Sequence, residues 1–180
     1  RVGLPEVTLG ILPGAGGTQR MPRLVGIPAA LDLIVNGKLV PAKKALALGI
    51  IDDIVEGDIV DAAVAHARRM VSENLPIRRA SALDDKVVEA RGTPEVFDDF
   101  RKTMARRARG LEAPFACVDC VEAAVNLPFA EGIVTERARF RELVASDQSK
   151  AQRHAFFAER QVTKIPDVPK STPTLSLDTA

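Results

Sequence analysis

The apolar and polar positions of the chain predict many helices and a few strands. Near the N-terminus, LPEVTLGILPGAGGTQR contains a short apolar run from Val7 to Leu12 that is typical of a strand, and Pro13 and Gly14 then break it. Further along, apolar residues recur every three or four positions, which is the spacing of amphipathic helices. We therefore expect a largely helical chain.

Proline and glycine mark the ends of the early helices, because proline is favoured in the first turn of a helix and glycine just after its last turn. Pro28 and Gly37 enclose one helix, and Pro41 and Gly49 enclose the next. The other predicted elements are a helix at about Gly16 to Leu24, a short strand over IIDDIVE at 50–56, a helix from Asp58 to about Glu73 with Asp58 as its N-cap, and helices at about Pro94 to Ala108, Pro114 to Asn126, Phe129 to Val144 and Ser146 or Asp147 to Lys164.

The two ends of the chain differ in character. The last predicted helix has an apolar stripe with Phe156 as its main anchor, so we expect this helix to lie in a hydrophobic groove. Beyond it, the proline-rich segment KIPDVPKSTPTLSLDTA shows no periodicity and is typical of a linker or tail. The N-terminus enters strand-like sequence without a polar lead-in, which we interpret as the middle of something larger.

Composition narrows the class of protein. The 180 residues are 46% hydrophobic, enough for a real core, and 25 basic against 24 acidic residues give a net charge of +1. Such a balance does not favour nucleic acid or an anionic membrane as a partner. No apolar run approaches the about 18 residues of a membrane span, and no export signal begins the chain. Two cysteines do not form a disulfide framework, so a reducing compartment fits best.

The glycine cluster GAGGTQ resembles a nucleotide loop only superficially. Gly14 and Gly16 have the right spacing, but the third glycine of a dinucleotide fingerprint would fall at Gln19, and no lysine followed by serine or threonine is present for a phosphate loop. Glycines at a helix start also let backbone N–H groups approach another group closely. The wall of a ligand pocket is one place where such a close approach to the backbone is needed.

Other candidate chemical groups have simpler interpretations. His66 and His154 fall on helical segments without a serine or cysteine in a triad order, so we interpret them as surface or half-buried helix residues. Cys117 and Cys120 lie three apart on an apolar helix face, where core packing is favoured over redox chemistry, and they lack the second ligand pair of a structural zinc site. We expect no metal site.

Glu6 is the open question. On physical grounds alone a single carboxylate at a strand edge is best interpreted as a solvated side chain. However, PEVTLGILPGAGGTQRMPRLVG followed by NGKLVPAKKALALGIIDDIV strongly resembles the crotonase, or enoyl-CoA hydratase, superfamily over about Val2 to Val55. The later stretch SDQSKAQRHAFFAERQVTKIPD resembles the last helix of the hydratase module in multifunctional fatty-acid oxidation proteins, where this module is joined to a 3-hydroxyacyl-CoA dehydrogenase.

The resemblance implies a partial α/β spiral of the ClpP/crotonase type that is mostly helical in this chain. It divides the chain into the C-terminal part of the crotonase core at 1–57, a helical extension of the hydratase module at 58–164, and a linker or disordered tail at 165–180. It also implies the cytoplasm of a bacterium or the matrix of an oxidative organelle.

The resemblance gives Glu6 a catalytic role in adding water to a trans-2-enoyl-CoA. Glu6 matches the family glutamate that protonates the α-carbon, and Gly14 matches the glycine beside the catalytic water. Leu12, Pro13 and Gly14 are the expected substrate contacts near the acid. The other glutamate and the oxyanion-hole donors belong to an earlier segment that this sequence lacks, so the chain is expected to contain half of the site and to be inactive alone.

Phe156 matches a family residue near the coenzyme A adenine, but Glu159 occupies the position of the accompanying lysine. Arg160 could substitute for this lysine only if the helix turns slightly. Expected partners are an acyl-CoA substrate, the missing N-terminal half and further copies of the chain. No cofactor is expected in this chain, and NAD would be needed only by a following dehydrogenase. The alternative is a non-catalytic acyl-CoA-binding or oligomerisation module.

Overall fold

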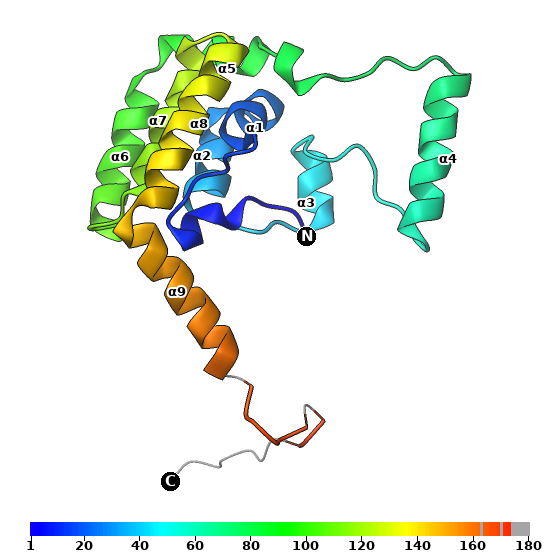
Figure 1. Ribbon diagram of the computed structural model, residues 1–180. Coiled ribbons are helices and arrows are strands. Elements are labelled where there is room, and N and C mark those ends of the chain that lie inside the picture. Colours follow the sequence, from blue (N-terminus) through cyan, green and yellow to red (C-terminus); the bar gives the residue numbers. More distant parts are fainter. Residues whose placement is uncertain (163, 170, 174–180) are drawn as a thin grey trace.

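Helices form nearly all of the regular structure of this chain. The computed structural model describes residues 1–162, 164–169 and 171–173 (Figure 1). In chain order the elements, with η for a 3₁₀ helix, are η1 (Pro5–Leu9), α1 (Gly17–Val25), α2 (Ile27–Val35), α3 (Ala42–Ala47), α4 (Ile59–Ser72), η2 (Ala80–Ala82), α5 (Asp85–Glu89), η3 (Ala90–Gly92), α6 (Glu95–Arg107), α7 (Ala113–Asn126), α8 (Phe129–Ala145) and α9 (Asp147–Val162). Every long helix predicted from the sequence is present, whereas α5 and the 3₁₀ helices are additional.

The core is built around α7, which packs against α1, α2, α6 and α8. Since α7 is apolar on most of its sides, it can only be stable when neighbours surround it. Leu31 and Ile34 of α2 and Phe97 of α6 fill the space beside it and are almost completely buried. The N-terminal helices and the later helices therefore share one hydrophobic core, while the expected boundary between 57 and 58 stays a prediction.

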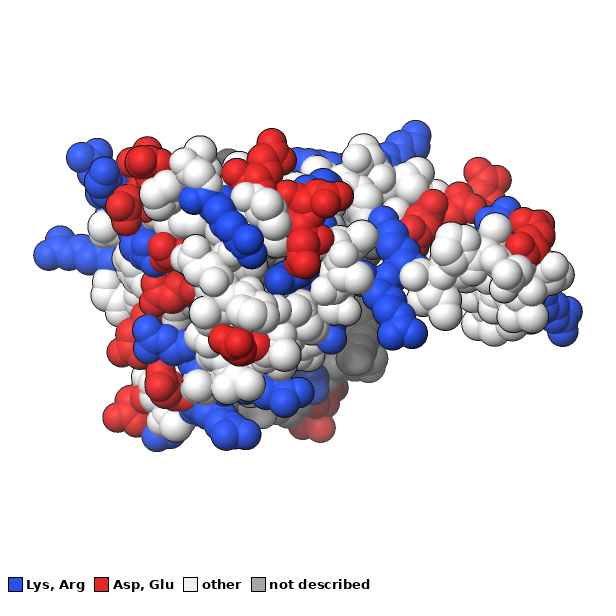
Figure 2. Space-filling view, turned by 90° about the horizontal axis from the view of Figure 1, so that it is seen from above, with Lys and Arg blue, Asp and Glu red and all other residues white. Residues whose placement is uncertain are grey.

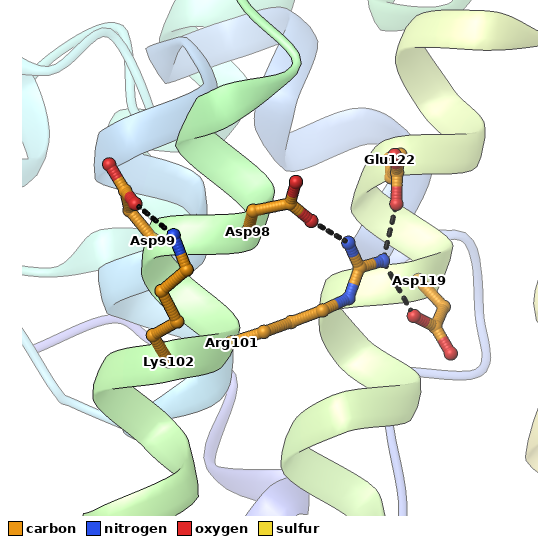
Figure 3. A network of polar contacts seen from close by, with 6 residues as sticks. All are labelled: Asp98, Asp99, Arg101, Lys102, Asp119 and Glu122. Atoms are coloured by element: carbon orange, nitrogen blue, oxygen red, sulfur yellow. Dashed lines mark hydrogen bonds and ion pairs between the residues drawn. The ribbon is translucent and has the colours of Figure 1, made fainter.

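A polar network ties α6 to α7 at the surface of this core (Figure 3). The Arg101 guanidinium lies 2.8 Å from Asp119 Oδ1, also pairs with Glu122, and is 3.5 Å from Asp98 on its own helix. Burial disfavours the charge of Arg101, but hydrogen bonds to Glu122 and Asp119 outweigh it and raise the pKa of this arginine. The network fixes how α6 lies on α7.

The helix α4 lies apart from the core, at the end of two extended segments (Figure 1). Asp58 caps it as predicted, since Oδ1 accepts from Val60 N at 2.8 Å and from Asp61 N at 3.0 Å. No α4 residue is buried. At the base of the two segments Arg78 pairs with Asp52 at 2.8 Å. The capping residues explain why α4 is a helix, and its apolar side chains remain on the surface.

Both predicted strands are wrong, and with them the spiral sheet expected for this part of the chain. Pro5 and Gly10 enclose the 3₁₀ helix η1 where the strand at Val7 to Leu12 was expected. The segment 50–56 contains bends and no strand. Among the described residues the only β pairing is an isolated antiparallel bridge between Val2 and Val40. A strand needs a neighbour to satisfy its backbone, whereas a 3₁₀ helix satisfies part of its own.

The interpretation of α9 is also corrected. Only Ser149 of this helix is buried, and Phe156 is half-buried. Figure 1 shows α9 extending away from the other helices, with its first turns near η1 and α8 and its later turns in solvent. The apolar stripe of α9 therefore does not lie in a hydrophobic groove of the described chain.

Charged side chains of both signs are interspersed over the face seen in Figure 2, as the balanced composition predicts. The lobe at the right of that view contains α4 and is mostly uncharged on its visible face. None of the helices in the described part of the chain is both long and apolar enough to cross a membrane.

Candidate active site

Glu6 lies in the first turn of η1. Its side chain is half-buried, and Oε2 is enclosed without a hydrogen-bond partner among the residues that the structure describes. η1 packs against α7. Burial, and then the neighbouring Cys120, raise the pKa of the Cys117 thiol on that helix. Glu6 is therefore not a solvated edge residue.

The first turns of α9 hold η1 in place. Ser149, which is fully buried, donates from Oγ to Leu9 O at 3.0 Å. Gly10 ends η1 with φ at 68°, in the left-handed region. A Cβ at this position would lie 2.9 Å from Ser149 Cα and would overlap the Gln152 side chain. Glycine is thus required both by the turn and by the close approach of α9.

The segment between η1 and α1 contains the other predicted site residues. The side chains of Leu12 and Pro13 are completely buried in the core. Gly14 is half-buried, and a Cβ there would overlap the ring of Phe140 on α8. Any contact of Leu12 or Pro13 with a ligand would therefore come from the backbone, and Gly14 is the residue of the three closest to the surface.

The glycine cluster is occupied by a carboxylate of the chain itself. Glu136 on α8 is completely buried, and Oε1 accepts from Gly16 N at 2.6 Å. Oε2 accepts from Thr18 N at 2.9 Å and from the Thr18 hydroxyl at 2.5 Å. The N-terminus of α1 is thus an anion site, as glycine-rich helix starts often are, and Glu136 supplies the anion.

Sequence reasoning missed Glu136 because 120 residues separate it from Gly16. The local signal available was the spacing of Gly132, Glu136 and Phe140, which places a small, an acidic and an aromatic residue on one face of a helix. Nothing in that pattern shows which segment the face contacts.

The two cysteines belong to the core. Both thiols are fully buried and unbonded. Burial raises the pKa of Cys117 far above its usual range and that of Cys120 to about 12. Because only the thiolate is a nucleophile, neither residue is suited to redox or covalent chemistry, in agreement with the packing interpretation.

Among the described residues, no hydrogen bond or ring contact joins Phe156 to Gly14 or Glu6. Phe156 lies on α9 one turn after Gln152. Its ring centroid is 5.4 Å from that of Phe157, in an edge-on arrangement, and the Arg160 guanidinium lies 4.0 Å from the centroid of the Phe156 ring. This arginine stacks on the residue expected near the adenine. The adenine contact stays a prediction.

The remaining candidates do not form a site in the described chain. His66 and His154 are exposed, and His66 lines a cleft between α4 and the residues Asp52 and Asp53. No group of three or more histidine, cysteine, aspartate or glutamate residues is arranged to hold a metal ion within the described ranges. The geometry thus leaves Glu6 and the glycine turn as the candidate active site.

Comparison with known proteins shows the family of the chain and leaves the site residues as predictions. The model of the enoyl-CoA hydratase/isomerase family matches residues 1–91, which include Glu6 and the whole glycine turn. The chain is 45% identical over 164 residues to the peroxisomal bifunctional enzyme of Danio rerio, a match that covers 91% of this chain and 22% of the relative. The human enzyme of the same name is 45% identical over 165 residues, with the same shares.

A bacterial relative extends the match to the end of α9 and beyond. The fatty acid oxidation complex subunit alpha of Shewanella sp. (strain MR-4) is 37% identical over 176 residues, which covers 96% of this chain and 24% of the relative. The chain thus spans about a quarter or less of the length of these relatives. The family match, which covers half of the chain, confirms the resemblance found in the sequence: this chain belongs to the enoyl-CoA hydratase/isomerase family.

Proposed function

We propose that this chain provides part of the active site of an enoyl-CoA hydratase of fatty-acid β-oxidation, and that Glu6 delivers the proton to the α-carbon of the substrate. The family match and the names of the relatives support the reaction class. Some relatives are peroxisomal by name and one is bacterial. Both are consistent with the compartments expected from the sequence, an oxidative organelle or the bacterial cytoplasm.

The observation that best supports the proposal is the enclosed and unpartnered Oε2 of Glu6. A buried acceptor without a partner costs about 1–3 kcal/mol, so folding alone gives no reason to keep it. A substrate or a catalytic water bound beside η1 would provide the missing partner. Costly local arrangements of this kind are typical of functional sites.

The proposed reaction needs few groups. A water oxygen bonds to the β-carbon while its proton passes to a partner carboxylate, and the double-bond electrons move toward the thioester oxygen. Glu6 then protonates the α-carbon, and backbone N–H groups stabilise the charge on the thioester oxygen in between. Gly14 would lie beside the water. Hydration consumes only water, so the proposal needs no cofactor, and coenzyme A enters as part of the substrate.

The partner carboxylate and the oxyanion donors are proposed to come from a segment before Arg1. The experiment compares the 180-residue chain with the extended protein, which is this chain together with the residues encoded before Arg1. Hydration of crotonyl-CoA is expected in the extended protein and not in the chain alone, because each missing group costs orders of magnitude in rate. Turnover by the chain alone, or a folded extended protein without hydratase activity, would contradict the proposal.

A second candidate is a module for assembly. Its specific support is α4, whose valines and isoleucine remain on the surface, with Ile59 72% and Val71 83% exposed. Apolar side chains on a separate helix favour association with another surface. This function is compatible with the first, since assembly and catalysis would use different elements.

A further inference from the structure

Glu136 is the one fully buried acid among the residues that the structure describes. Its exposed fraction is 0%, and three donors of the glycine turn and α1 surround its two oxygens. Moving a carboxylate out of water is costly unless hydrogen bonds and favourable dipoles replace its hydration. The N-terminus of α1 provides both. The three hydrogen bonds to Glu136 thus depend on the turn keeping this shape.

A helix cap does not require such an arrangement. α1 begins after Gly16, which has no side chain to cap the helix and whose φ of 87° disfavours serine or aspartate there. A local cap would satisfy the helix without fixing where the turn lies. Glu136 instead comes from a helix 120 residues later, so its bonds join the turn to α8.

The same face of α8 contacts the turn at two further points. A Cβ at Gly132 would overlap the Gln19 side chain, so this side chain of α1 lies against the α8 backbone one turn before Glu136. One turn after it, Phe140 lies against Gly14. Three successive turns of one helix thus fix the segment from Gly14 to Gln19.

We infer that Glu136 is a positioning residue for the proposed hydration, which sets the backbone of Gly14 to Gly16 relative to Glu6. This inference rests on the proposed function of Glu6 and extends it to a residue of α8. Both Glu136 oxygens accept hydrogen bonds from Gly16 and Thr18, so this residue acts through the turn. A displacement of a catalytic group by about 1 Å can lower a rate about 100-fold.

The first test uses the 180-residue chain and measures backbone amide resonances. Glu136→Gln replaces one acceptor oxygen by a donor that faces a backbone N–H, so the amide protons of Gly14, Gly16 and Thr18 are expected to shift, with those of α4 unchanged. The matched control is Glu131→Gln on the same helix, where the side chain is exposed. Unchanged resonances of the turn in Glu136→Gln would overturn the inference.

The second test measures hydration of crotonyl-CoA by the extended protein. Glu136→Gln is expected to lower kcat about 100-fold with little change in KM, since the turn moves and the coenzyme A contacts do not. Glu131→Gln should keep both constants. If Glu6→Gln abolishes turnover while Glu136→Gln keeps its kcat, the positioning role is wrong and the proposed function stands. If Glu6→Gln keeps its turnover, the proposed function itself fails.

A milder pair of variants covers the case in which Glu136→Gln does not fold. Thr18→Val removes the hydroxyl that donates to Glu136 and keeps the shape of the side chain, whereas Thr18→Ser retains the hydroxyl. The inference predicts a lower kcat for Thr18→Val and recovery in Thr18→Ser. Equal kcat values for wild type and a folded Thr18→Val would contradict it.

Discussion

Two carboxylates near the glycine turn differ in how their oxygens are satisfied. Glu136 accepts three hydrogen bonds, while Oε2 of Glu6 accepts none from the described residues. Stability favours a fully hydrogen-bonded buried carboxylate such as Glu136, whereas Oε2 of Glu6 remains available to accept a hydrogen bond from a bound ligand. The sequence showed neither difference, because both acids follow ordinary local patterns. Only the resemblance to a family distinguished Glu6, and Glu136 needed the packing of α8 on α1.

The thiols of Cys117 and Cys120 provide a pH prediction at the same scale. Because burial raises both pKa values, the folded state keeps its thiol protons at a pH where the unfolded chain, with a pKa of about 8.5, has lost them. Their stabilising contribution is complete below that pH and is lost as the pH rises toward the folded values. We expect the free energy of unfolding to fall by about 2–4 kcal/mol between pH 8 and pH 10.

Urea unfolding under reducing conditions measures this slope. The control is the double variant Cys117→Ala and Cys120→Ala, in which the thiol contribution is absent. Its slope should be clearly smaller, whatever the loss of packing does to its stability at pH 8. The same steep slope in the variant would show that other groups are responsible.

At the scale of elements, the sequence predicted helices well because their signals are local. Asp58 caps α4 through its own side chain, and Pro28 lies in the first turn of α2, so neither position depends on distant residues. The strand predictions were wrong because a strand forms only when another strand pairs with its backbone. In η1, Pro5 and Gly10 decide the conformation, and the apolar run between them is satisfied by packing against α7.

The Arg101 network should contribute measurably to the α6–α7 contact. Arg101→Met removes three ion pairs of which two are only partly exposed, so we expect a loss of about 1 kcal/mol in the free energy of unfolding. Lys102→Met is the matched control, since Lys102 and its partner Asp99 are both strongly exposed (Figure 3). Equal stability of the two variants would mean that the network adds nothing beyond a surface pair.

The way α9 packs predicts that a substitution in its first turn lowers the free energy of unfolding more than one in its later turns. Ser149→Ala leaves the half-buried Leu9 O without its donor and Arg153 Nη1 without its acceptor, so a loss of about 1–2 kcal/mol is expected. Phe156→Ala should cost less than about 1 kcal/mol, because this ring is only half-buried. Denaturant unfolding ranks the two. A loss of about 3 kcal/mol for Phe156→Ala, typical of a core truncation, would show that the outer turns of α9 pack on the body.

For the whole molecule, the separate position of α4 predicts association. Val60, Val64 and Val71 are exposed on this helix, and the lobe that contains α4 is mostly uncharged in Figure 2. Sedimentation velocity should show oligomers whose fraction rises with concentration, and replacement of the three valines by glutamate should remove them. Arg68→Gln, an exposed change on the same helix, is the control. A compact wild-type monomer that binds no hydrophobic dye would contradict this expectation.

The central claim is that Glu6 is the acid that protonates the α-carbon, and Glu6→Gln in the extended protein tests it most directly. The amide keeps the shape of the side chain but cannot deliver the proton, so kcat for crotonyl-CoA should fall at least about 100-fold. Acyl-CoA affinity should change little, and the melting temperature should not fall, because Oε2 has no hydrogen bond to lose within the described chain. Glu56→Gln, at an exposed position, should match the wild type. A folded Glu6→Gln protein with wild-type kcat would contradict the account.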